Sequence, residues 1–214
     1  GTGFTPGGWT QRTSNINTLT QFMLVKLDTG GNGAAVREIG TATANFTLSN
    51  ADIRVVRNGA TYTLLCTGNL YLPGGTNAAD GDIPAPTYPS GTAYTQPAAP
   101  EFNALIFSIS SDMETIHWIK NIGADQAATK SIDWINISTV DYAGNVYIGG
   151  RTTGTANISY NNPSSQTTRL GTVDGWLMKL SSTGTMIWSR YLNSRAGDST
   201  VVLSMELNRA GNGI

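Results

Sequence analysis

The chain is poor in the residues on which most catalytic and metal sites depend. Its 214 residues include one cysteine and one histidine, and charged side chains make up only 13% of them, about half the usual share. A single cysteine cannot form a disulfide within the chain, and one cysteine with one histidine cannot supply the usual ligands of zinc. The formal net charge of -1 argues against a nucleic-acid surface, because phosphates require clustered lysine and arginine.

Long apolar runs and helical periodicity are also missing. No stretch approaches the roughly 18 apolar residues that a membrane-spanning helix needs, so we predict no membrane span. The sequence does not start with the charged and then apolar leader that directs secretion. Its last residues, 211–214, have the pattern of a hairpin turn entering a strand. We therefore expect the chain to be a processed product or a segment of a longer polypeptide.

What the sequence does contain is typical of β-sheet. Hydrophobic residues make up 39% of the chain, enough to bury a core, and they occur in short β-branched and aromatic runs between clusters of Gly, Asn, Asp and Ser. Three runs resemble one another, and a polar turn and a second strand follow each. In every case a third and a fourth strand come next, joined by a turn that contains glycine. The three runs are residues 21–28, 101–109 and 174–180, and the three glycines are Gly59, Gly144 and Gly211.

A four-stranded unit that recurs in this way predicts an all-β protein made of β-propeller-like antiparallel blades. Only about two and a half to three blades fit in the chain, fewer than the four or more of a closed propeller. We therefore expect an incomplete ring. The predicted organisation is a leader or arm (1–20), a first unit (21–71), a Pro-rich insertion (72–100), a second unit (101–158), a polar insertion (159–173) and a truncated third unit (174–214).

Two stretches carry a family resemblance. Residues 140–152 contain Asp141-Tyr142-Ala143-Gly144-Asn145, and residues 174–192 run from Asp-Gly-Trp through Lys-Leu and a Gly turn to Trp188. Together they resemble the repeat of secreted bacterial proteins known as the seven-bladed β-propeller repeat. They are also similar to quinoprotein propeller repeats, whose Gly-x-x-x-Trp docking motif has a counterpart in Gly184 to Trp188. The resemblance implies the fold and a secreted or cell-surface setting, and it implies no chemistry.

The aromatic residues and the cysteine of the strands have structural interpretations. Trp118 and Trp188 stand at matched places in two units, and we expect them to occupy equivalent buried positions between blades. Stacking against a ligand is the alternative. Cys66 lies in an apolar run, and we expect a small buried residue there and not a catalytic thiol.

Candidate binding residues lie outside the strands. Residues 72–100 form a long insertion with six of the eight prolines, and such insertions are either ordinary surface loops or binding loops. Its Tyr88 and Tyr94 are candidate contacts, as is Trp9 in the leader. Three Asn-x-Ser/Thr sequons are candidate glycosylation sites, although chance matches are common in a chain rich in Asn and Thr. They are at Asn45, Asn136 and Asn157.

Metal and cofactor sites have little support. The loop from Asp28 to Gly33 offers oxygen ligands but lacks the spacing and closing glutamate of a calcium loop. The pair Asp80 and Asp82 has the same shortcoming, so we interpret the first loop as a hairpin turn and predict no metal and no cofactor. Phosphate-binding and dinucleotide-binding glycine motifs are absent.

These observations favour an extracellular structural or adhesive segment that is not an enzyme. Its expected partners are other copies of itself or the rest of a longer chain. The alternative is a propeller that binds a glycan or another ligand through its loops. An enzyme of the quinoprotein type is a third possibility, and it would need an active carboxylate among Asp125, Asp133, Asp141 and Asp174.

Overall fold

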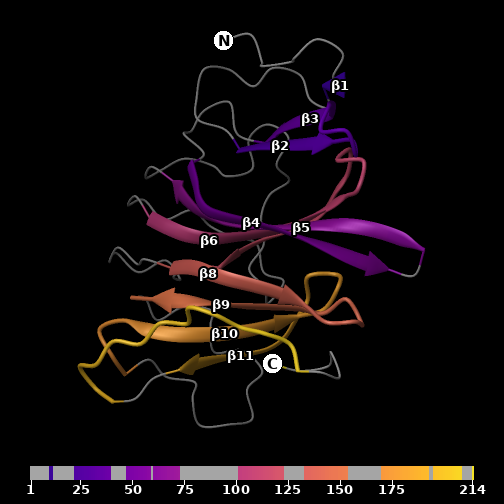
Figure 1. The fold of residues 1–214 in the computed structure, drawn as a ribbon. Helices are drawn as coiled ribbons and strands as arrows, with labels where there is room; N and C mark the ends of the chain where they lie inside the picture. Colours follow the sequence, from indigo (N-terminus) through magenta and orange to yellow (C-terminus); the bar gives the residue numbers. More distant parts are fainter. Residues whose placement is uncertain are drawn as a thin grey trace.

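The computed structural model describes residues 10–11, 22–39, 47–58, 60–72, 101–122, 133–153, 170–192, 195–208 and 214. Within these residues the regular elements are all strands, which confirms the all-β prediction (Figure 1). The described part holds no helix long and apolar enough to cross a membrane. The strands are β1 (Thr10–Gln11), β2 (Phe22–Leu27), β3 (Gly33–Ile39), β4 (Thr47–Asn58), β5 (Thr61–Leu72), β6 (Glu101–Ser110), β7 (Ile116–Ile122), β8 (Asp133–Val140), β9 (Val146–Thr152), β10 (Asp174–Leu180) and β11 (Met186–Leu192).

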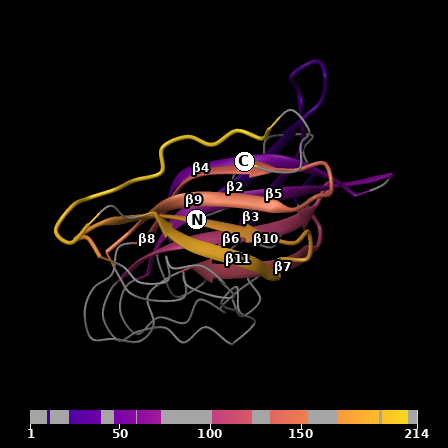
Figure 2. The ribbon, with the colours of Figure 1, turned by 90° about the horizontal axis from the view of Figure 1, so that it is seen from below.

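The strands form three stacked sheets. Sheet A has the order β1-β3-β2, sheet B the order β4-β5-β6-β7, and sheet C the order β11-β10-β9-β8. Sheets B and C are antiparallel meanders, in which each strand pairs with its neighbours along the chain, whereas β1 joins β3 in parallel. Figure 1 shows the order A, B, C from top to bottom, and Figure 2 shows from below that the strands of sheets B and C run in broadly the same direction.

The sheets divide the repeat at a different point from the units defined on the sequence. Each unit was drawn to start at the strand that begins at residue 21, 101 or 174, which corresponds to β2, β6 or β10. Sheet B instead combines the last two strands of the first unit with the first two strands of the second. A repeated pattern gives the period of the strands but not the strand at which a sheet begins. The 72–100 insertion consequently connects β5 and β6, which are neighbours in one sheet.

The two inner strands of sheet B, β5 and β6, are buried on both faces along their middle parts, and this explains their apolar runs. Side chains alternate along β5, so that Leu65 faces sheet C and Cys66 faces sheet A. The same alternation holds in β6, where Ile106 packs in the core with sheet C and Phe107 in the core with sheet A. All four side chains are at most 1% exposed. Burial on both faces makes sheet B the layer on which the other two sheets are assembled.

Polar contacts fix sheet C on sheet B. The buried side-chain amide of Asn69, in β5, accepts a hydrogen bond from Ile135 N (2.8 Å) and donates one to Ile135 O (3.2 Å) in β8. Ile135 lies beside a β-bulge, where the register of β8 against β9 shifts by one residue. Such a bulge leaves backbone groups without a ladder partner. The Asn69 side chain supplies that partner from the neighbouring sheet.

The segment 195–208 lies against the outer face of sheet C (Figures 1 and 2). Val202 N donates a hydrogen bond to Gly150 O in β9 (3.3 Å), and the Val202 side chain is buried. A Cβ added to Gly149 would come within 2.8 Å of Val202. Glycine at this position therefore lets the segment approach β9 closely.

Four hairpins share one turn. The first residue of each turn accepts a backbone N–H with its side chain, and the fourth residue has a positive φ, between 64° and 81°. Asp28 Oδ1 and Asp141 Oδ1 each accept from the asparagine four residues later at 2.8 Å. The serines that begin the other two turns, Ser110 and Ser181, accept from a threonine N–H through Oγ. The loop that begins at Asp28 is therefore a hairpin turn, as the sequence indicated.

One turn carries a non-glycine residue in the left-handed region. Gly31, Gly144 and Gly184 occupy the fourth position of three turns, and Met113 with φ 64° occupies it in the turn between β6 and β7. The left-handed region costs an L-residue roughly 1–2 kcal/mol. Met113 is 2% exposed and belongs to the core between sheets A and B. Burial of its side chain offsets the backbone strain.

Asp141 should make the stability of sheet C depend on acid. Burial raises the pKa of its carboxyl. Hydrogen bonds from Asn145 and Ala143 and the charge of Lys179 (3.6 Å) together lower the pKa by more than burial raises it, so the pKa lies below the ordinary value of 3.8. The stabilisation is complete above that value and is lost as pH falls through the lower folded pKa. We expect Asp141→Asn to lose about 1–3 kcal/mol at neutral pH and to unfold with a weaker acid dependence in urea titrations. An unchanged acid dependence would contradict this.

Candidate functional site

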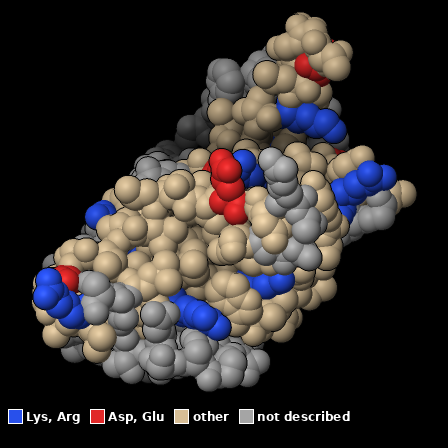
Figure 3. Space-filling model, turned by 60° about the horizontal axis from the view of Figure 1, so that its bottom comes forward, with Lys and Arg blue, Asp and Glu red and all other residues tan. Residues whose placement is uncertain are grey.

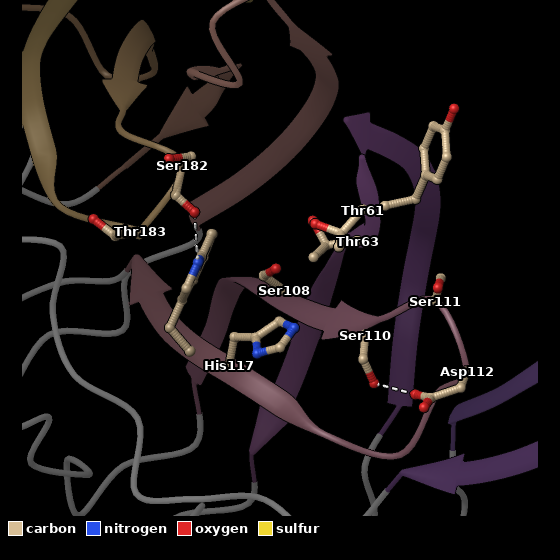
Figure 4. Close-up of a pocket in the computed structure, with 11 residues that line it drawn as sticks. Thr61, Thr63, Ser108, Ser110, Ser111, Asp112, His117, Ser182 and Thr183 are labelled. Carbon is tan, nitrogen blue, oxygen red and sulfur yellow. Dashed lines mark hydrogen bonds between the residues drawn. The ribbon is translucent and has the colours of Figure 1, made fainter. Parts of the chain in front are cut away.

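The candidate site is a groove of about 630 Å³ where sheets B and C meet. It lies at one end of the sheets, between the β6–β7 hairpin, the start of β5 and the β10–β11 turn (Figure 4). Its lining is rich in hydroxyl groups and includes one carboxylate, one imidazole and two aromatic rings. The lining residues are Thr61, Tyr62, Thr63, Ser108, Ser110, Ser111, Asp112, His117, Trp118, Ser182 and Thr183.

A β-bulge places His117 in the groove. In the pairing of β6 with β7, Ser108 stands opposite Trp118 and Ile109 opposite Ile116, so His117 is the extra residue. A bulge re-aims the side chain that it inserts. His117 is exposed, and Figure 4 shows its ring pointing into the groove beside Ser108.

The same bulge recurs in the other hairpins of this type. The extra residue is Ala34 in the β2–β3 hairpin and Ile187 in the β10–β11 hairpin. The bulge is thus a property of the repeat, and the histidine is particular to sheet B.

Trp118 forms the wall of the groove toward sheet C. Its indole Nε1 donates a hydrogen bond to Ser182 O in the β10–β11 turn (3.1 Å). A Cβ added to Gly184 would lie 2.6 Å from the Trp118 ring, a distance that no side chain tolerates. The ring therefore packs directly on the glycine backbone, and we call Trp118 and Gly184 the docking pair. Its NH group and its ring both contact sheet C, which is the packing role expected from the sequence.

Trp118 and Trp188 are equivalent by register, as expected. Both are half-buried, whereas we expected them to be buried. Each stands next to the extra residue of its bulge, opposite Ser108 or Lys179. Trp188 lies on the far side of sheet C, where its ring meets Tyr147 edge-on at 6.3 Å between centroids. Trp118 is half-buried because it packs against the β10–β11 turn and not against a sheet. The tryptophan that is completely enclosed is Trp176, at 0% exposure.

The turn residues of the groove are engaged by backbone groups. Ser110 Oγ donates to Asp112 Oδ1 and accepts from Glu114 N (3.2 Å) and Thr115 N (2.9 Å). Asp112 Oδ1 accepts a further bond from Glu114 N (3.0 Å). These contacts stabilise the turn and give Ser110 and Asp112 a structural role.

The other reactive groups are also held in structural contacts. Cys66 is buried, and desolvation together with the charge of Asp52 raises the pKa of its thiol to about 12, so little thiolate forms at neutral pH. Asp141 caps its turn, and Asp174 accepts hydrogen bonds from Leu170 N (2.7 Å) and Gly171 N (3.1 Å). No group of three or more His, Cys, Asp or Glu side chains that could hold a metal ion occurs among the described residues.

Most binding residues named from the sequence lie outside the described residues: Trp9, Asn45, Tyr88, Tyr94, Asp125 and Asn157. Asn136 is described, and it lies in β8. Its side-chain nitrogen donates to Val202 O (2.9 Å) in the segment that covers sheet C. A glycan on this nitrogen would replace one of its two hydrogens and would lie next to this segment.

Sequence reasoning did not identify the groove. Its serines and threonines belong to three hairpin ends that are far apart in the chain, and each resembles an ordinary polar turn. His117 and Trp118 were the available signal, because an adjacent imidazole and indole interrupt an otherwise apolar strand.

Comparison with protein-family models finds no match for the chain, and comparison with curated proteins finds no significant relative.

The docking pair leads to a matched test. Gly184→Ala and Gly31→Ala impose a similar backbone strain of roughly 1–2 kcal/mol, since both glycines have φ near +80°. Only the change at Gly184 also places a methyl group inside the contact distance of Trp118, because nothing lies within 4 Å of the equivalent position at Gly31. We expect Gly184→Ala to lose about 1–3 kcal/mol more than Gly31→Ala in urea unfolding at low protein concentration. Equal losses would show that Trp118 does not depend on the glycine.

Proposed function

We propose that the chain is an extracellular structural or adhesive segment made of β-propeller-type blades, which mediates assembly or surface interactions. The observation that carries this proposal is the docking of each sheet on the hairpin turn of the next through side chains of equivalent strands, β3 and β7. Trp118 reaches the turn of sheet C. Arg37, two residues after the equivalent position in β3, donates to Met113 O (2.6 Å) in the turn of sheet B.

Several features support blade-type stacking. Sheets B and C are four-stranded meanders, they pack face to face, and their hairpins share a bulge and a turn. Such repeats bury their apolar faces only by stacking, so their role is usually to present a surface. The extracellular setting rests on the resemblance of residues 140–152 and 174–192 to secreted propeller repeats.

Cell-surface display tests the adhesive role. Bacterial cells that display the chain should remain on a polysaccharide-coated surface after washing in several-fold greater number than cells that display an unrelated all-β protein at the same density. Equal retention of the two cell types would overturn the adhesive proposal.

A glycan is the second candidate ligand, and the groove favours it. The described lining residues carry many hydroxyl groups and no lysine or arginine, a composition suited to a neutral polyol and unsuited to a phosphorylated or sulfated ligand. Tyr62 is 49% exposed at the rim, and aromatic faces at such places offer apolar area together with a hydroxyl group. His117 adds a polar group beside it.

Titration with neutral oligosaccharides tests this second candidate. We expect His117→Ala and Tyr62→Ala each to weaken binding about tenfold, which corresponds to the loss of about 1.4 kcal/mol. Tyr142→Ala is the matched control, since Tyr142 is 83% exposed and is not among the groove residues. Isothermal calorimetry gives the affinities. An affinity that is the same for all three variants and the unmodified chain would place the ligand elsewhere.

A further inference from the structure

The two ends of the stack carry complementary halves of a docking pair that is already formed inside it. Inside the stack, Trp118 of sheet B packs on Gly184 of sheet C, whose φ is +77°. At the outer end of sheet C, Trp188 stands at the position equivalent to Trp118. In sheet A, Gly31 with φ +80° stands at the position equivalent to Gly184, and a Cβ added there would meet nothing within 4 Å.

The junction of sheets A and B shows that these positions act as a matched set. Ala35 takes the tryptophan position there, and Met113 takes the glycine position. Both residues belong to the core between the two sheets. At the B–C junction the strand carries the large residue and the turn the small one. At the A–B junction the strand carries the small residue and the turn the large one. We therefore expect Gly31 to pack against a large side chain such as Trp188 and not against an alanine.

On the outer face of sheet A, the side chains of β2 are exposed, whereas Val36, which stands opposite Val25 in β3, is 1% exposed. Met23, Val25 and Leu27 are 44%, 41% and 54% exposed. By register, their equivalents in sheet B are Leu105, Phe107 and Ile109, and in sheet C they are Trp176, Met178 and Leu180. All six equivalents are at most 1% exposed, because each set packs on the preceding sheet.

The outer face of sheet C offers the matching surface. Ile187 is 39% exposed, and the Arg190 guanidinium lies 5.9 Å from the Trp188 ring. Arg190 is equivalent to Arg37, which bonds the turn of sheet B at the first junction. Figure 3 shows this end of the molecule with a mostly uncharged described surface, on which the charged side chains lie in a few places, some with opposite charges side by side. Arg190 would need an acceptor at such a contact, and the equivalent Arg37 finds one in the carbonyl of Met113.

The segment 195–208 starts a further layer on the outer side of sheet C. The segment 195–208 lies over β9 through Val202. Its Thr200 contacts Gly175 at the start of β10 and Leu192 at the end of β11, and Ile187 and Arg190 of β11 are exposed. In sheets B and C, the strands equivalent to β2 and β3 occupy that place within their own layer. Strands β2 and β3 of a second copy would therefore continue the layer that 195–208 starts.

We propose that copies of this chain associate head to tail, with the outer face of sheet A in one copy docked on the outer face of sheet C in the next. Trp188 of one copy packs on Gly31 of the other, and the row Met23, Val25 and Leu27 is buried at the contact. The occupant is a second copy because this chain itself carries both halves of the pair and their flanking residues. The contact is heterologous, so it propagates into longer assemblies or closes a ring. The inference rests on the proposed role of the sheets as stacking blades.

Sedimentation velocity of the full chain tests the proposal. The unmodified chain should shift to larger species over about a hundredfold rise in concentration. Val25→Glu alters the sheet A face and Ile187→Glu the sheet C face, and each should weaken association at least about tenfold because a charge would be buried at the contact. Tyr142→Glu adds the same charge outside both faces and should leave association unchanged.

Mixing the two face variants separates a head-to-tail contact from other contacts. Each variant keeps the face that the other lacks, so an equimolar mixture should form dimers and nothing longer, although neither variant associates alone. A chain that stays monomeric throughout, or a mixture that stays monomeric, overturns the proposal, as does a loss of association in Val25→Glu but not in Ile187→Glu. These outcomes leave the adhesion of displayed cells to polysaccharide as a separate measurement.

Discussion

The contact of the Trp118 ring with Gly184 sets how closely sheet C can approach sheet B. A ring on a bare backbone gives the shortest separation that an aromatic side chain allows, and the indole NH finds a carbonyl acceptor in the same turn. At this separation the apolar side chains of the two sheets meet, and the Asn69 amide reaches the backbone of β8.

The sequence predicted most of the strands because local chemistry determines them, although residues 201–208, where a third strand of the last unit was expected, form no strand. The inner strands of sheet B are apolar on both faces, so they stood out as apolar runs, and the turns at Asp28 and Asp141 carried a recognisable Asp-x-x-Gly-Asn pattern. The grouping of strands into sheets was not predictable in this way. It depends on which strand edges pair, and every unit boundary drawn on a repeat is consistent with the same period.

The candidate groove and the burial of the tryptophans could not be predicted from the sequence, because both depend on how the sheets pack. The strand pattern indicated that Trp118 and Trp188 are equivalent, but the exposure of each side chain depends on whether a sheet or only a turn lies opposite. The groove collects hydroxyl groups from β5, the β6–β7 hairpin and the β10–β11 turn. Nothing in a single stretch marks these serines and threonines, because each is also what an ordinary turn requires.

The two junctions between sheets pair a small residue with a large one in opposite order, Ala35 with Met113 and Trp118 with Gly184. This difference determines which sheet can pack on which. A turn that carries Met113 has no room for a tryptophan on the facing strand, and a turn that carries glycine beside Ala35 would leave a void. Sheets in this chain are therefore not interchangeable, although their backbones are alike. A unit duplicated or moved by recombination would be accepted only beside a neighbour of the complementary size. The order of the blades is thus encoded in pairs of side chains, much as the matched residues of a coiled coil select a partner.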